Sequence, residues 1–110
     1  MLFFLQLQNN IQLFHWNAVS YSAHKASDKL YQNLGPLIEK FVEVGLEKRM
    51  HAFEDKITVC HKTLPKMKVY LNKCCSTLKN LPLENDLASL RDSMLEEIHQ
   101  FLYLANLNKI

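Results

Sequence analysis

FHWNAVSYSAHKASDKLYQNLGPLIEKFVE, residues 14–43, is the stretch that decides the fold and holds the residues with the most evident chemistry. Two imidazoles and three carboxylates lie in it, namely His15, His24, Asp28, Glu39 and Glu43. Imidazole nitrogen together with carboxylate oxygen is the ligand mixture that suits divalent ions such as Fe(II), Mn(II) or Zn(II). The stretch therefore predicts a metal site that uses these five residues.

Length and composition predict one compact helical domain over residues 1–110. The chain has 110 residues and is 48% hydrophobic, which is enough for one core but not for two. Two glycines and three prolines leave few turns, and the sequence shows no repeat or low-complexity tract. The net charge of +2 is well below the concentrated positive charge that nucleic-acid binding alone requires.

The cysteines and the first residues indicate the compartment. Cys60, Cys74 and Cys75 are an odd number, and the adjacent pair cannot form an unstrained disulfide, which argues against a secreted disulfide framework. The opening MLFFLQLQNN lacks a basic segment, and its glutamines and asparagines interrupt the apolar run. We therefore expect reduced thiols, a cytoplasmic location, and neither an export signal nor a membrane anchor.

Apolar residues at three- and four-residue spacings predict four helices. The expected helices cover roughly residues 2–19, 23–48 and 66–81, and a last one from Asn85 or Asp86 to residue 107. Residues 49–65 have no helical period, end at Pro65, and include ITVC, which we expect to be extended. Four helices with one long connection between the second and the third form an all-α, ferritin-like four-helix bundle.

The first expected helix is apolar on two faces. One face carries Phe3, Leu7, Ile11 and Phe14, and the other carries Leu2, Leu5, Leu13 and Trp16. Three companion helices in a small monomer do not usually cover both faces of such a helix. We therefore expect the protein to be a homo-oligomer.

The second expected helix contains a proline that interrupts its hydrogen bonds. Ser22 is the expected N-cap. Gly35 and Pro36 predict a kink or break near Leu34, since proline lacks an amide donor and collides with the preceding turn. The expected buried stripe consists of Ala26, Leu30, Leu34, Leu37, Phe41 and Val44.

The acidic residues of this helix point away from its buried stripe. At about 100° per residue, Asp28, Glu39 and Glu43 lie together well over a quarter turn from the side of Leu34 and Phe41. A di-iron site inside one bundle needs ligands that project inward from several helices. These carboxylates can therefore take part only in a site that is shared with another subunit.

The same stretch resembles the ferroxidase segment of the Dps-like ferritins, closest to the small Dps-like proteins of large DNA viruses. FHWN, a histidine followed four residues later by aspartate, and the acids Glu39 and Glu43 carry the resemblance. It implies an iron-binding protein in which His15 and His24 of one subunit face Glu39 and Glu43 of its mate across a two-fold axis. Asp28 completes this di-iron or mono-iron site, and Trp16 packs beside it. The resemblance also implies a hollow shell and a place in host cytoplasm or a virion.

Departures from the family pattern keep a second hypothesis open. The interval from His15 to His24 is shorter than in cellular Dps proteins, Pro36 lies between Asp28 and Glu39, and Glu39 stands where aspartate is usual. Each change can displace a ligand. The alternative is a non-catalytic structural or virion-associated assembly protein that keeps the fold with a vestigial site.

Other patterns predict surface or core residues. Glu96 and His99 form one E-x-x-H, but Glu96 lies nearly opposite the buried stripe. The cysteines lack the paired spacing of a zinc site, so buried thiols are expected. The lysines of the third segment predict a solvated helix face; they are Lys62, Lys66, Lys68, Lys73 and Lys79. Neither end is a basic arm, so DNA binding has little support.

Overall fold

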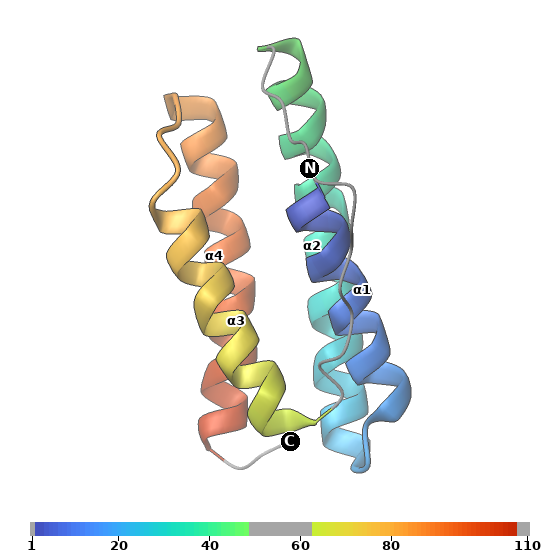
Figure 1. Ribbon diagram of the computed structural model, residues 1–110. Coiled ribbons are helices and arrows are strands. Elements are labelled where there is room, and N and C mark those ends of the chain that lie inside the picture. The colour runs from blue at the N-terminus through green and yellow to red at the C-terminus, as the bar shows by residue number, and fades with distance from the viewer. Residues whose placement is uncertain (1, 49–62, 108–110) are drawn as a thin grey trace.

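The structure, a computed structural model, describes residues 2–48 and 63–107 and contains four α-helices and no strand within those ranges (Figure 1). The helices are α1 (Leu2–Asn17), α2 (Tyr21–Glu47), α3 (Leu64–Lys79) and α4 (Asn85–Asn106). The prediction of an all-α protein with four helices is confirmed. Most of the expected connection, including ITVC, lies outside the described residues.

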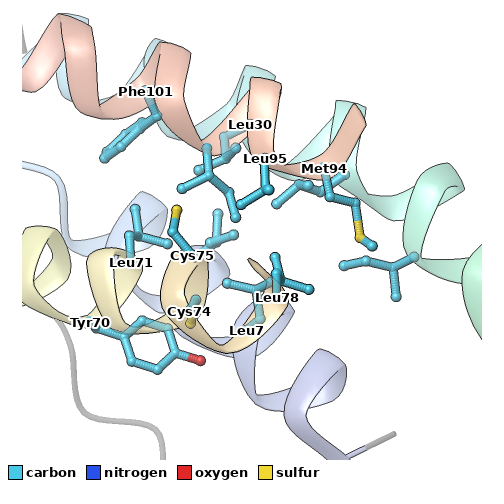
Figure 2. Close-up of a cluster of buried hydrophobic side chains, with 14 of the residues drawn as sticks. Leu7, Leu30, Tyr70, Leu71, Cys74, Cys75, Leu78, Met94, Leu95 and Phe101 are labelled. Carbon is cyan, nitrogen blue, oxygen red and sulfur yellow. The ribbon is translucent and has the colours of Figure 1, made fainter. Parts of the chain in front are cut away.

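The helices are arranged as two antiparallel hairpins around one core. Each of α1 and α4 packs against both α2 and α3, so that α1 and α4 are diagonal neighbours (Figure 1). Phe4 of α1 contacts Phe41 of α2, and Phe14 of α1 contacts Phe101 of α4 across the core. Figure 2 shows the centre of this core, where Leu71 and Leu78 of α3 lie near Leu95 of α4.

Helix α2 begins earlier than expected, and a different serine caps it. Ser20 is the N-cap in an extended conformation, and its hydroxyl accepts a hydrogen bond from the Ala23 amide at 3.1 Å. The prediction that Ser22 is the cap is wrong, because Ser22 lies in the first turn of the helix. Both serines fit the N-cap preference, and only the path of the chain after α1 distinguishes them.

Pro36 does not break α2. The prediction was a kink or a break near Leu34; the helix runs from Tyr21 to Glu47 with Pro36 inside it, so the break is wrong. Proline removes one hydrogen bond to the carbonyl of Gln32. Core residues on both sides, Leu34 and Ile38, are almost fully buried and hold the helix in one piece.

The buried stripe of α2 also differs in part from the expected one. Leu30, Leu34 and Phe41 are buried as expected, but Ile38 is in the core where Leu37 was expected. Ala26, Leu37 and Val44 are only half-buried. The observed buried residues are Ala23, Ser27, Leu30, Leu34, Ile38, Phe41 and Gly45.

The second apolar face of α1 is only partly covered in the single chain, since Leu2 and Leu13 are half-buried while Leu5 and Trp16 are exposed. Phe4, rather than the expected Phe3, is buried together with Leu7, Ile11 and Phe14. On the other face Leu5 is 49% exposed and Trp16 is 69% exposed. The helix contains no aspartate, glutamate, lysine or arginine. An uncharged, partly apolar outer face is unusual in water and typical of a contact between proteins.

Helices α3 and α4 carry the remaining core residues. Helix α3 begins at Leu64, two residues before the expected start, with Pro65 in its first turn, where the missing amide is not needed. Cys74 and Cys75 are buried as expected, and burial raises the pKa of the Cys74 thiol to about 11. Burial also raises the pKa of Tyr70, which lies beside Cys74 (Figure 2).

Candidate metal centre

The turn between α1 and α2 brings His15 and His24 together. His15 lies in the last turn of α1 and His24 in the first turn of α2. The Asn17 side chain donates to the Leu13 carbonyl at 2.8 Å and closes α1, and Ser20 caps α2. The chain therefore reverses within three residues, and the two histidines lie side by side.

The two imidazole rings are stacked. Their centroids are 3.9 Å apart, and their planes differ by 25°. His15 Nδ1 lies 2.8 Å from the His24 carbonyl oxygen and 3.1 Å from Ser27 Oγ. His24 Nδ1 lies 3.2 Å from the His15 carbonyl oxygen. The imidazole of each histidine is thus hydrogen-bonded to the main-chain carbonyl of the other histidine.

These contacts assign the tautomer of both rings. A carbonyl oxygen only accepts hydrogen bonds, so the Nδ1 atom of His15 and that of His24 each carry a proton and donate it. In a neutral imidazole the Nε2 atom then has a free lone pair. Metal-binding histidines are usually held in this way, with the second ring nitrogen donating to a carbonyl or carboxylate. The pair therefore has the protonation pattern of metal ligands.

Ser27 supports the histidine pair from inside the bundle. Its side chain is fully buried, and its hydroxyl donates to the Ala23 carbonyl at 2.8 Å and can accept from His15 Nδ1. Ser27 is not among the residues that the sequence pattern indicated as ligands. Its position three residues after His24 and on the buried side of α2 is the signal that could have identified it.

Asp28 lies one helical turn after His24. Its side chain is half-buried, and both carboxylate oxygens accept hydrogen bonds from Gln32 Nε2 at 3.1 Å. The carboxylate keeps further lone pairs for another donor or a cation. Asp28 is therefore placed to extend the candidate half-site that His15 and His24 form along α2.

Glu39 and Glu43 form a separate candidate half-site. Both side chains are exposed, one turn apart, and no cationic side chain of residues 2–48 and 63–107 forms an ion pair with them. They line a groove of about 820 Å³ between α1 and α2, together with Phe4, Leu5, Gln8, Tyr31, Gln32, Gly35, Pro36, Ile38 and Val42. The expected outward orientation of these acids is confirmed.

One subunit does not bring all five residues together. His24 and Glu39 are fifteen residues apart on α2, which corresponds to about 22 Å at 1.5 Å per residue. Within the described ranges no three His, Cys, Asp or Glu side chains are close enough to hold one metal ion. The histidine half-site and the glutamate half-site can therefore meet only between two chains.

The remaining candidate residues lie where surface or core residues are expected. Glu96 is exposed, and its neighbour Glu97 accepts a hydrogen bond from Asn33 at 2.9 Å. Lys66, Lys73 and Lys79 are exposed, and Lys68 is half-buried. Cys60, His61 and Lys62 lie outside the described residues.

Comparison with known proteins places the candidate site inside a recognised family. Residues 15–104 match the family described as "Family of unknown function (DUF5856)". The chain belongs to this family. The matched region begins at His15 and contains all five candidate ligands, and the description assigns no activity to the family. No curated protein and no solved structure matches the chain.

None of α1 to α4 combines the length and the apolar composition that crossing a bilayer requires.

Proposed function

We propose that the protein is a Dps-like, ferritin-like iron-binding protein that oxidises Fe(II) at a site shared by two subunits. The observation that carries the proposal is the histidine pair. Both Nδ1 atoms donate to carbonyl oxygens, which leaves both Nε2 lone pairs for a metal. The sequence resemblance supplies the choice of iron among the divalent ions that suit such ligands.

Each residue has a defined role in this proposal. His15 and His24 of one subunit bind Fe(II) through Nε2, and Glu39 and Glu43 of a second subunit supply negative charge that favours the ferric product. Asp28 adds a carboxylate on the histidine side. The indole of Trp16, which is 69% exposed next to His15, packs beside the bound iron.

The reaction is a redox exchange with peroxide or oxygen, in which iron is the substrate. With peroxide, two Fe(II) ions each lose one electron. One hydrogen peroxide takes up both electrons and two protons, its O–O bond breaks, and two water molecules form. The protein supplies the ligands and holds the ions, and the iron carries out the electron transfer. The resemblance further favours a shell of subunits and a location in host cytoplasm or a virus particle.

A second candidate function is structural. The uncharged outer face of α1, with Leu5 and Trp16 exposed, favours an assembly role that needs no metal. In that case the ligands are a vestige of an iron-binding ancestor, and the protein is a component of a larger assembly such as a virion.

Iron oxidation distinguishes the two functions. Fe(II) is added anaerobically with a small excess of hydrogen peroxide, and Fe(III) formation is followed by ultraviolet absorbance. We expect His24→Ala and Glu43→Ala to be at least about a hundredfold slower than wild type, as for the loss of a metal ligand. Glu96→Ala is the control, because Glu96 is an exposed carboxylate away from both half-sites. Equal rates in all four proteins would end the enzymatic proposal and leave the structural one.

A further inference from the structure

One end of the bundle, called here the α1–α2 end, is built from all four helices. It consists of residues 11–27, which run from α1 through the turn into α2, residues 64–70 at the start of α3 and residues 100–107 at the end of α4 (Figure 1). The start of α3 lines a cavity together with the turn. Leu104 of α4 lines a groove together with Tyr21 of α2. These segments therefore form one continuous surface.

Most of the large apolar side chains that the described residues expose lie at this end. Six of the eight are there, namely Trp16, Val19, Tyr21, Val69, Tyr103 and Leu107, and the other two, Leu5 and Leu46, lie at the opposite end. Val19, in the turn, is fully exposed. Trp16 already has a place beside the iron in the proposed function, which leaves five. Isolated exposed apolar residues are normal, but a group of them indicates a contact with a protein or a membrane.

The α1–α2 end is also positively charged. Its residues include three lysines, Lys25, Lys66 and Lys68, and no aspartate or glutamate. The corresponding segments of the opposite end, residues 2–8, 41–47, 73–79 and 85–91, carry three acidic and three basic residues. Seven residues of helix extend about 10 Å, which is close to the Debye length at 0.1 M salt. The lysines therefore act on a surface at this end without acidic side chains beside them.

Lysine mixed with exposed aliphatic and aromatic residues favours a lipid surface. Lysine is depleted from protein–protein interfaces relative to the rest of the protein surface. Single-stranded nucleic acid stacks its bases on aromatic rings and offers no site for aliphatic side chains such as those of Val19, Val69 and Leu107. An anionic membrane accepts both kinds of residue, because apolar and tyrosine side chains enter its headgroup region and lysines are attracted to its charge.

We propose that the α1–α2 end docks on an anionic membrane surface. Val19 and Leu107 enter the headgroup region, and Lys25 and Lys66 bind the phosphate or carboxylate groups of the lipids. The Lys25 ammonium lies 5.4 Å from the centroid of the Tyr21 ring, so this cation and this ring reach the surface together. The contact uses neither the histidine pair nor the glutamate pair, so it stands whether or not the protein oxidises iron.

Vesicle co-sedimentation tests the contact. Wild-type protein is mixed with vesicles of phosphatidylcholine alone, or with vesicles of phosphatidylcholine and phosphatidylserine in equal parts. The partition constant should be about a hundredfold higher for the anionic vesicles, because each of three lysines near such a surface contributes about fivefold. Raising the salt concentration from about 0.1 M to about 1 M should remove most of this preference, because the Debye length falls from about 10 Å to about 3 Å.

Apolar substitutions at the two ends show which surface binds. Val19→Gln together with Leu107→Gln should lower the partition constant for anionic vesicles at least about tenfold, because two apolar side chains no longer leave water. The control, Leu5→Gln together with Leu46→Gln, removes two exposed apolar side chains at the opposite end and should keep the wild-type constant. Far-UV circular dichroism checks that both variants remain helical.

Charge reversals at the two ends of α3 test the electrostatic part. Lys66→Glu should lower the partition constant for anionic vesicles at least about tenfold, because it replaces an attraction by a repulsion. Lys79→Glu is the control; it makes the same change on the same helix, about 20 Å further along, which is about two Debye lengths. It should keep the wild-type constant.

Each outcome decides for or against the lipid surface. Preference for anionic vesicles, weakened by the substitutions at the α1–α2 end and not by the controls, supports the proposal. Equal weakening by the controls, or no binding of the wild-type protein to vesicles, overturns it. Without vesicle binding, capture of a single-stranded oligonucleotide identifies nucleic acid as the occupant. Self-association that falls only in the Val19→Gln, Leu107→Gln variant then identifies a second copy of this chain. Either result also overturns the proposal.

Discussion

Ser27→Val tests whether the buried hydroxyl supports the histidine pair. The side chain is fully buried, donates to the Ala23 carbonyl and lies 3.1 Å from His15 Nδ1. Losing this hydroxyl lowers the free energy of unfolding by about 0.5 to 1.5 kcal/mol. The loss is no larger because His15 keeps its 2.8 Å hydrogen bond to the His24 carbonyl, so no buried donor is left without an acceptor. The extra methyl groups overpack the site by about 1 to 3 kcal/mol. Together these two effects should lower the free energy of unfolding by about 1.5 to 4.5 kcal/mol.

Urea denaturation followed by circular dichroism measures this loss. The matched control is Ser22→Val, which makes the same change in the exposed first turn of α2 and should stay within about 0.5 kcal/mol of wild type. Affinity for Co(II), used as a stable probe of the histidine pair, should fall about tenfold in Ser27→Val because the support of the ligand is lost. Equal stability of Ser27→Val and Ser22→Val refutes the view that Ser27 is a buried partner of His15.

Two further predictions concern the core. Because burial raises the pKa of Cys74 to about 11 while an unfolded thiol titrates near 9, the unfolded chain loses its proton first. The free energy of unfolding should therefore fall as pH rises from about 9 towards 11. Urea titrations at several pH values give the free energy of unfolding as a function of pH. Its decrease with pH should be shallower in Cys74→Ala than in wild type. A wild-type free energy of unfolding that does not change over this pH range contradicts the raised pKa of Cys74. Phe101→Ala should lose about 3 to 5 kcal/mol because its buried ring contacts Phe14 in the core. Tyr103→Ala, at a 62% exposed position of the same helix, should lose less than about 0.5 kcal/mol, and equal losses contradict the core packing.

The number of helices and the outward direction of the acids followed from periodicity, because both depend only on residue spacing along one chain. Glu39 and Glu43 are exposed as their angular position predicts. Periodicity could not decide whether Ser20 or Ser22 is the N-cap of α2. Both residues suit an N-cap, and the three-residue turn that selects Ser20 depends on how α1 packs against α2.

The break expected at Pro36 and the stacking of the histidines show a second limit of sequence reasoning. A proline inside a helix costs a hydrogen bond, but burial of Leu34 and Ile38 on both sides keeps α2 continuous. The mutual bonds of His15 and His24 arise from the geometry of a tight turn between two packed helices. Residue types predicted a metal site here, whereas the tautomer and the role of Ser27 required the packed structure.

The central claim, that one site takes its histidines from one chain and its glutamates from another, is tested most directly by mixing two inactive variants. His24→Ala and Glu43→Ala are unfolded together in urea, refolded as a mixture and assayed for Fe(II) oxidation. Random pairing makes about half of the dimers mixed, and each mixed dimer has one intact site of two, so about a quarter of the wild-type rate should return. A mixture no faster than either variant alone, while wild type refolded in the same way is active, contradicts a shared site.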